Sequence, residues 1–149
     1  MKTEKGQKKN EIKIKLPSLS VNESVARSAV AAFCAQLDPS TVEIADIKCV
    51  VSEAVTNCIV HGYRDTVGVI YITVELYDDG LVVIEVRDRG VGIEDVRMAR
   101  TPLFTTDAAN ERSGMGFTVM ESFTDRLRVS SKVGSGTSVV MYKKLEGRR

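Results

Sequence analysis

The sequence predicts an α+β protein, a two-layer sandwich in which a mostly antiparallel sheet of five strands carries its helices on one face. Two observations support this prediction. Residues 70–77 and 81–88 alternate apolar and polar side chains on either side of an Asp-Asp-Gly turn, as the two strands of a hairpin do. Earlier in the chain, apolar residues recur every three to four positions through 20–37 and 40–61, as on one face of a helix. Strands of this kind with amphipathic helices between them pack as two layers.

Length and composition limit the possibilities further. The 149 residues suffice for one domain with a sizeable core and are too few for two. Charged residues make up 28% of the chain and hydrophobic ones 43%, which excludes wholesale disorder. The net charge of +1 gives no electrostatic reason to expect nucleic acid or an acidic membrane surface as the main partner. No uncharged run could span a bilayer, and three cysteines without a CxxC pair favour a reduced, cytoplasmic protein.

The N-terminal part begins with residues 1–10, which are polar and basic and are expected to form a disordered tail before a single domain over 11–149. Apolar residues alternate with lysines over 11–17, which predicts a strand ended by a proline. Ser20 and Glu23 then have the spacing of a capping box, which predicts the start of the first helix.

A second capping box, Ser40 with Glu43, starts a long helix that we expect to run to His61, with Gly62 at its C-terminal cap. Its apolar stripe consists of Ile47, Val50, Val51, Ala54 and Cys58. After the hairpin, the predicted elements are a short helix over 94–100, a mobile loop over 101–113, a helix over 114–123, and strands over 126–131 and 137–145 joined by a turn at 134–136.

Glu53, Asn57 and His61 are spaced by four residues, so they lie along one edge of the long helix and flank its apolar stripe. A carboxylate at a partly buried rim can act as a general base. An Asn amide oxygen one turn away is a hard, neutral ligand that suits Mg²⁺. Considered alone, the same residues also fit an ordinary polar rim.

A second constellation is Asp88-Arg89-Gly90-Val91-Gly92, at the end of a predicted buried strand. An ionised Asp only accepts hydrogen bonds, so at a pocket floor it would accept from the exocyclic amine of adenine and repel the carbonyl of guanine. The two glycines allow close approach of the backbone. A plain strand-ending turn is the alternative interpretation.

The third is Ser113-Gly114-Met115-Gly116-Phe117 at a predicted helix start. Backbone N–H groups at a helix start form an anion site, and Arg112 just before them could reach a terminal phosphate. Neither a Walker A loop nor a dinucleotide fingerprint is present, and a flexible helix entry would explain the glycines equally well.

In this order, the segments Glu53–Gly62, Asp88–Gly92, Gly114–Gly116 and Gly136–Thr137 resemble the sequence boxes of the GHKL ATPases, whose ATP-binding domain has the Bergerat fold. That class includes gyrase, MutL and histidine kinases. A histidine kinase needs a separate acceptor histidine, but the single histidine lies inside the first box. Gyrase and MutL carry a further transducer domain, for which this sequence leaves no residues, so we expect a free-standing domain.

Three longer segments, VVSEAVTNCIVHGY, PLFTT and ERSGMGFTVMESF, are similar to the bacterial anti-sigma factors that are also serine kinases, and most of all to those of spore-forming bacilli. The resemblance implies that Glu53 is the general base and Asn57 the Mg²⁺ ligand. It implies that Asp88 reads adenine, with Gly92 against the base and Thr137 supporting the aspartate, and that residues 101–116 form the ATP lid. The other nucleotide-binding residues implied are Gly90, Thr105, Thr106, Arg112, Ser113, Gly114, Met115, Gly116 and Phe117.

The same resemblance implies ATP or ADP and Mg²⁺ as cofactors, a homodimer, and two protein partners. One is a sigma factor of the sporulation type, which is held and inhibited. The other is an anti-anti-sigma factor, which is phosphorylated on a serine. No direct contact with nucleic acid or membrane is expected. Two alternatives stay open: a stress-response anti-sigma kinase with a different sigma factor, and a binding module that uses ATP only to shape its partner surface.

Overall fold

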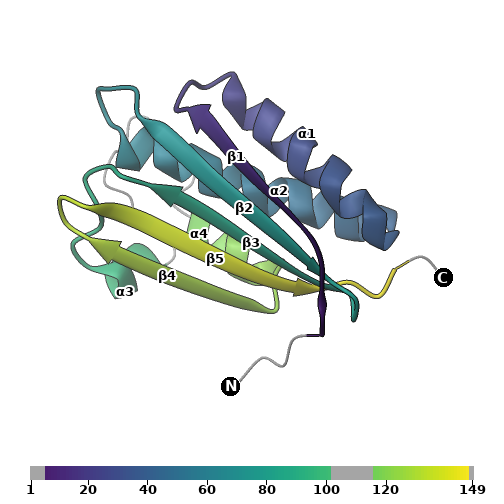
Figure 1. Ribbon diagram of the computed structural model, residues 1–149. Coiled ribbons are helices and arrows are strands. Elements are labelled where there is room, and N and C mark those ends of the chain that lie inside the picture. The colour runs from purple at the N-terminus through teal and green to yellow at the C-terminus, as the bar shows by residue number, and fades with distance from the viewer. Residues whose placement is uncertain (1–5, 102–115, 148–149) are drawn as a thin grey trace.

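The computed structural model describes residues 6–101 and 116–147. In chain order the elements are β1 (Lys8–Pro17), α1 (Asn22–Cys34), the 3-10 turn η1 (Ala35–Leu37), α2 (Thr41–Asn57), the π-helical turn η2 (Cys58–Gly62), β2 (Val69–Tyr77), β3 (Leu81–Asp88), α3 (Val96–Ala99), α4 (Gly116–Ser122), β4 (Arg126–Lys132) and β5 (Gly136–Lys144). The strands form one sheet in the order β1-β2-β3-β5-β4, with every neighbouring pair antiparallel. Helices α1, α2 and α4 lie behind one face of this sheet (Figure 1). The predicted two-layer α+β architecture is confirmed.

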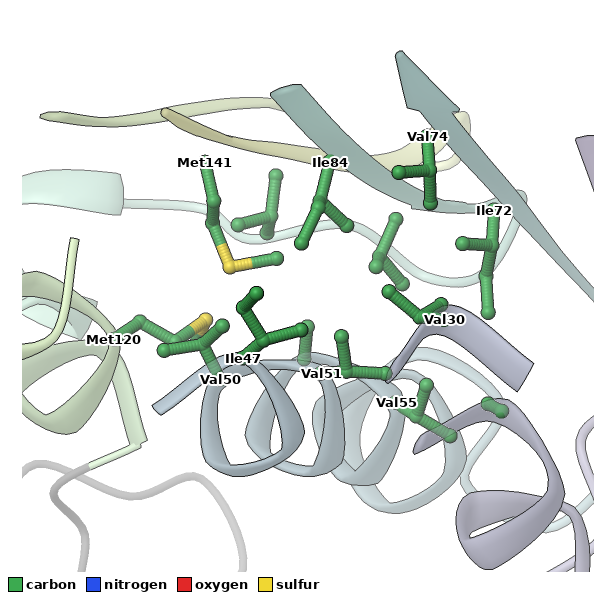
Figure 2. Packing of buried hydrophobic residues seen from close by; sticks show 14 of the residues in the cluster. Val30, Ile47, Val50, Val51, Val55, Ile72, Val74, Ile84, Met120 and Met141 are labelled. Carbon is green, nitrogen blue, oxygen red and sulfur yellow. The ribbon is translucent and has the colours of Figure 1, made fainter. Parts of the chain in front are cut away.

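The core lies between α2 and the sheet. The predicted stripe on α2 is confirmed, because each of its members is at most 4% exposed: Ile47, Val50, Val51, Ala54 and Cys58. Figure 2 shows Ile47, Val50 and Val51 of this stripe facing Ile72, Val74, Ile84 and Met141 of the strands, with Val30 of α1 and Met120 of α4 closing the two sides. The alternating strands each contribute their apolar face to this layer, which is the burial that holds helices and sheet together.

Strand β1 begins three residues earlier than expected, so the prediction of a disordered tail over 1–10 is wrong for residues 8–10. Lys8 pairs with Tyr77 and Asn10 with Leu76, with a register shift between the two pairs. The polar composition misled the prediction, because an exposed edge strand is held by backbone pairing and needs no apolar side chains.

The predicted capping box at Ser20 is also wrong. Helix α1 begins at Asn22, and no side chain caps it. Ser20 instead uses its backbone carbonyl, which accepts from the N–H of Glu23 at 3.2 Å. The Glu23 carboxylate pairs with Arg27 one turn later at 3.3 Å.

The capping box at the start of α2 is confirmed, since Glu43 N–H donates to Ser40 Oγ at 3.1 Å and Ser40 N–H donates to Glu43 Oε1 at 2.9 Å. The same carboxylate accepts from Glu146 N–H at 2.7 Å and from Gly147 N–H at 3.2 Å. Glu43 therefore ties the C-terminal end of the described chain to the start of α2.

The far end of α2 differs from the prediction. The α-helix stops at Asn57 and continues as a wider π turn, closed by Tyr63 N–H donating to Cys58 O at 2.8 Å. Gly62 has no left-handed conformation and is not the predicted cap. A side chain at Gly62 would meet the Asp88 carboxylate, which explains the glycine by space and not by backbone angle.

The remaining strands follow the prediction to within one residue at each end. The Asp-Asp-Gly hairpin is confirmed, with Gly80 at φ +92°. Helix α3 spans only Val96–Ala99, where 94–100 was expected, because Asp95 caps it by accepting from Met98 N–H at 3.0 Å. The predicted loop 101–113 and the start of the helix expected over 114–123 fall almost wholly outside the described residues. In the described part of the chain, no helix is both long and apolar enough to cross a bilayer.

Candidate functional site

A pocket of about 790 Å³ opens where the end of α2, the turn η2 and the end of β3 meet the loop before α3. Six of the residues predicted to bind nucleotide lie in its wall: Asn57, Asp88, Gly92, Gly116, Phe117 and Thr137. These residues come from segments far apart in the sequence, and the sheet brings them to one place. The convergence that the sequence motifs imply is therefore present in the fold.

Asp88 ends β3 and is only 5% exposed. Its Oδ1 accepts from Gly90 N–H at 2.9 Å and from Thr137 N–H at 3.3 Å, and the Cys58 thiol also donates to this carboxylate. Burial raises the pKa of Asp88, while these hydrogen bonds act in the opposite direction. Burial, together with the Asp88 charge, raises the pKa of the Cys58 thiol well above its ordinary value, so this thiol stays protonated as a donor.

Glycine is required around Asp88 because backbones come close there. Gly90 packs directly on the carbonyl of Gly62, which in turn accepts from Val91 N–H at 3.0 Å. Gly90 does not line the pocket itself but packs against Gly62, which does. Gly92 has φ +79°, and a side chain there would run into the backbone of Lys132.

Asn57 lines the pocket, and Glu53 lies one turn earlier on α2, outside the pocket wall; both are half-buried as the rim prediction requires. A methyl group added at Gly116 would lie 3.3 Å from Asn57 Oδ1 and 3.4 Å from Glu53 Oε2. The carboxylate, the amide and the start of α4 are thus immediate neighbours. Such a group of oxygens can accept a proton or hold a hard cation.

Most residues of the predicted ATP lid fall outside the part of the chain that the structure describes. Among them are Thr105, Thr106, Arg112, Ser113, Gly114 and Met115. Phe117, just after them, is 9% exposed and belongs both to the pocket wall and to the core. On the two sides of this segment, Arg100 and Glu121 form an ion pair.

The sequence motifs missed most of the apolar wall of the pocket, which includes Val86, Ile93, Val96, Ala99, Val133 and Val139. They also missed Tyr63, whose hydroxyl accepts from Arg89 N–H at 2.7 Å and donates to Val69 O at 2.6 Å. A third missed residue is Ser131, which hydrogen-bonds to Thr137 at 2.8 Å. No sequence signal marks Ser131, since its partners are fixed only by strand register.

A sequence model of the histidine kinase-like ATPase domain matches residues 16–143. An anti-sigma F factor of Priestia megaterium is 51% identical over 138 residues, which is 92% of this chain and 94% of that protein. One of Caldanaerobacter subterraneus subsp. tengcongensis is 56% identical over 134 residues, or 90% of this chain and 93% of that protein. The chain belongs to the anti-sigma F factor family of histidine kinase-like ATPase domains.

Solved structures show the same fold in this ATPase family. The RsbU and RsbW domains from Mycobacterium tuberculosis superpose with a TM-score of 0.68 at 22% identity, covering 92% of this chain and 33% of that one. The histidine kinase domain of a blue-light activated kinase from Erythrobacter litoralis gives 0.54 at 20% identity, covering 83% and 61%. Family membership confirms the resemblance seen in the sequence, and it shows a domain of the ATP-binding kinase or ATPase type.

Proposed function

We propose that this ATPase domain is a protein serine kinase that also acts as an anti-sigma factor. It would hold a sigma factor of the sporulation type and phosphorylate a serine of the anti-anti-sigma antagonist. The relatives named anti-sigma F factor, which match nearly the full length of the chain, support the partners. The observation that carries the kinase activity is the position of Glu53 beside Gly116 and Asn57, two residues that line the pocket.

Glu53 would serve as the general base. Its carboxylate sits on a rigid helix, half-buried and one turn from the amide that lines the pocket. As a serine oxygen attacks the terminal phosphoryl group, the proton of the hydroxyl needs an acceptor, and a positioned carboxylate provides it. A domain that used ATP only to shape a binding surface would need no such base.

Asn57 would hold Mg²⁺ together with the phosphates. Among the described residues, no group of three or more His, Cys, Asp or Glu could hold a metal by itself. The single amide oxygen of Asn57 fits Mg²⁺, which takes one or two protein oxygens and completes its shell with phosphate and water. When bound, the ion would neutralise charge on the phosphates. Asp88 would accept from the amino group of adenine at the other end of the pocket, which fixes the direction of the nucleotide.

The partner-dependent part of the proposal concerns the segment after α3. Residues 101–116 would form the ATP lid, with Thr105, Thr106 and Arg112 near the phosphates and Ser113, Gly114 and Met115 following them. A lid of this kind lets a partner sense whether ATP or ADP is bound, which is all that partner switching requires. We further propose a homodimer working in the cytoplasm, which fits the three free thiols at Cys34, Cys49 and Cys58.

The test uses Glu53→Gln, with Glu85→Gln on the opposite face of the sheet as control. The purified proteins are incubated with γ-labelled ATP and the anti-anti-sigma partner, and nucleotide affinity is measured separately by calorimetry. We expect Glu53→Gln to lower phosphoryl transfer by about 10²- to 10⁴-fold with ATP affinity nearly unchanged. Unchanged transfer would remove Glu53 from the role of base. Tight ATP binding by the wild type with no labelled serine would instead support the binding module.

A further inference from the structure

The inner end of the ATP site is formed by a row of three polar side chains on neighbouring strands. Asp88 of β3 is the register partner of Thr137 on β5, and Thr137 is the register partner of Ser131 on β4. Directly paired residues project from the same face of a sheet, so the three side chains stand next to one another. Asp88 and Thr137 line the pocket, and Ser131 lies beside Thr137 on the side away from Asp88.

The hydrogen bonds of Ser131 determine where its proton lies. Its hydroxyl donates to the carbonyl of Gly136 at 3.0 Å, and a carbonyl can only accept. Its oxygen also accepts from Ile93 N–H at 2.7 Å. One lone pair of the Ser131 oxygen is left, and Thr137 Oγ1 lies 2.8 Å away. Since the Ser131 hydroxyl proton points to the Gly136 carbonyl, the Thr137 hydroxyl must donate its own proton to the Ser131 oxygen.

The Thr137 hydroxyl therefore has no proton left for a ligand and can only accept. Asp88 beside it, when ionised, is acceptor-only as well. The inner end of the pocket then offers acceptors from two side chains and no side-chain donor from either of them. A ligand group with two N–H donors matches this pair, whereas a carbonyl oxygen would face uncompensated lone pairs.

We propose that Ser131 is a positioning residue that sets base specificity: it holds the Thr137 hydroxyl as an acceptor, so that the ATP site favours a 6-aminopurine over a 6-oxopurine. The inference rests on the proposed nucleotide-binding function and extends it to a residue outside the pocket wall. Without Ser131, the Thr137 hydroxyl can rotate and donate to a 6-oxo group, so discrimination falls even though every pocket-lining residue is kept.

The test compares dissociation constants for Mg·ATP and Mg·ITP, because hypoxanthine carries a 6-oxo group and a protonated N1 where adenine has the amine and a bare N1. We expect the preference for ATP over ITP to fall about 3- to 10-fold in Ser131→Ala, the range that corresponds to one hydrogen bond. Ser131→Thr keeps the hydroxyl and should restore the preference. Ser130→Ala, one residue away on the opposite face of β4, should leave it unchanged.

A merely structural role for Ser131 would weaken both nucleotides equally and leave their ratio intact, and that result would overturn the proposal. A double-mutant cycle gives the second check: with Thr137→Val in place, Ser131→Ala should change the ratio no further. An additive effect would show that Ser131 does not act through Thr137. Thermal unfolding of each variant establishes that it is folded. A wild type that binds neither nucleotide would reject the ATP site itself, and this inference with it.

Discussion

Replacing Gly62 by alanine tests whether the position of the Asp88 carboxylate, and not merely its presence, decides nucleotide binding. The added methyl group would lie 2.8 Å from Asp88 Oδ2 and 2.9 Å from its carboxyl carbon, where ordinary contacts begin at 3.4 Å. The carboxylate must therefore retreat by about 0.6 Å, the difference between 3.4 and 2.8 Å. The main chain at Gly62 has no positive φ, so alanine causes no backbone strain.

The magnitude follows from what holds Asp88. A retreat of that size would stretch the bond from Gly90 N–H, now 2.9 Å, to the limit of a hydrogen bond, and the bond from Thr137 N–H is already 3.3 Å. The bond that the adenine amine would donate to Asp88 is also a hydrogen bond to a charged group, which contributes about 1.5–3 kcal/mol, so misplacing the carboxylate should weaken ATP binding about 10- to 100-fold. Overpacking costs about 1–3 kcal/mol of stability, and the better helix propensity of alanine offsets up to about 1 kcal/mol.

Calorimetric titration with Mg·ATP and a thermal melt measure the two effects separately. Gly134→Ala is the matched control: its φ of +83° makes alanine strained, but nothing lies within 4 Å of the new methyl group. That variant should lose about 1–2 kcal/mol of stability and bind ATP normally, the reverse of Gly62→Ala. If Gly62→Ala bound ATP within about twofold of the wild type, the claim that the site depends on the placement of Asp88 would fail.

Two further predictions concern groups whose partners the structure defines. Burial raises the pKa of Asp88, so its charged form is less stable in the folded chain than in the unfolded one. Asp88→Asn should therefore raise the melting temperature at pH 7 while weakening ATP binding. The gain in melting temperature should vanish below about pH 4, because the wild-type carboxyl is then protonated in both the folded and the unfolded chain. A lower melting temperature at pH 7 would contradict this prediction. Ser40→Ala removes one half of the capping box of α2 and should lower the free energy of unfolding, measured by urea denaturation, by about 1 kcal/mol. Ser20→Ala, at the position that is not a cap, should change it little. Equal losses in the two variants would contradict the assignment of Ser40 as the helix cap.

The amphipathic parts of the fold could be predicted from the sequence because their patterns are local. The stripe on α2 and the alternation in β2 and β3 record which face is buried, and the Asp-Asp-Gly turn needs only the positive φ of Gly80. A local pattern can also fail. Ser20 and Glu23 have the spacing of a cap, yet no side chain caps α1, and Glu23 makes another local contact, with Arg27 one turn later.

The candidate site was predictable only where its residues are neighbours in the sequence. Glu53 and Asn57 are one turn apart on any helix, so their proximity is a property of the sequence. Their position beside Gly116, and that of Asp88 beside Gly62, depend on how α2, α4 and β3 pack. The sequence therefore indicated the chemistry of the residues, and the packing brought them together around one pocket.

Sequence alone determined the helical and strand periodicities, the hairpin, the types of the site residues and the family. Only the tertiary structure decided the strand order, the π turn at the end of α2, the reason for glycine at 62 and the contact between the Thr137 and Ser131 hydroxyls. The physical reason is range: periodicity and turn chemistry act over a few residues, whereas these features arise where segments distant in sequence compete for the same space and the same hydrogen-bond partners.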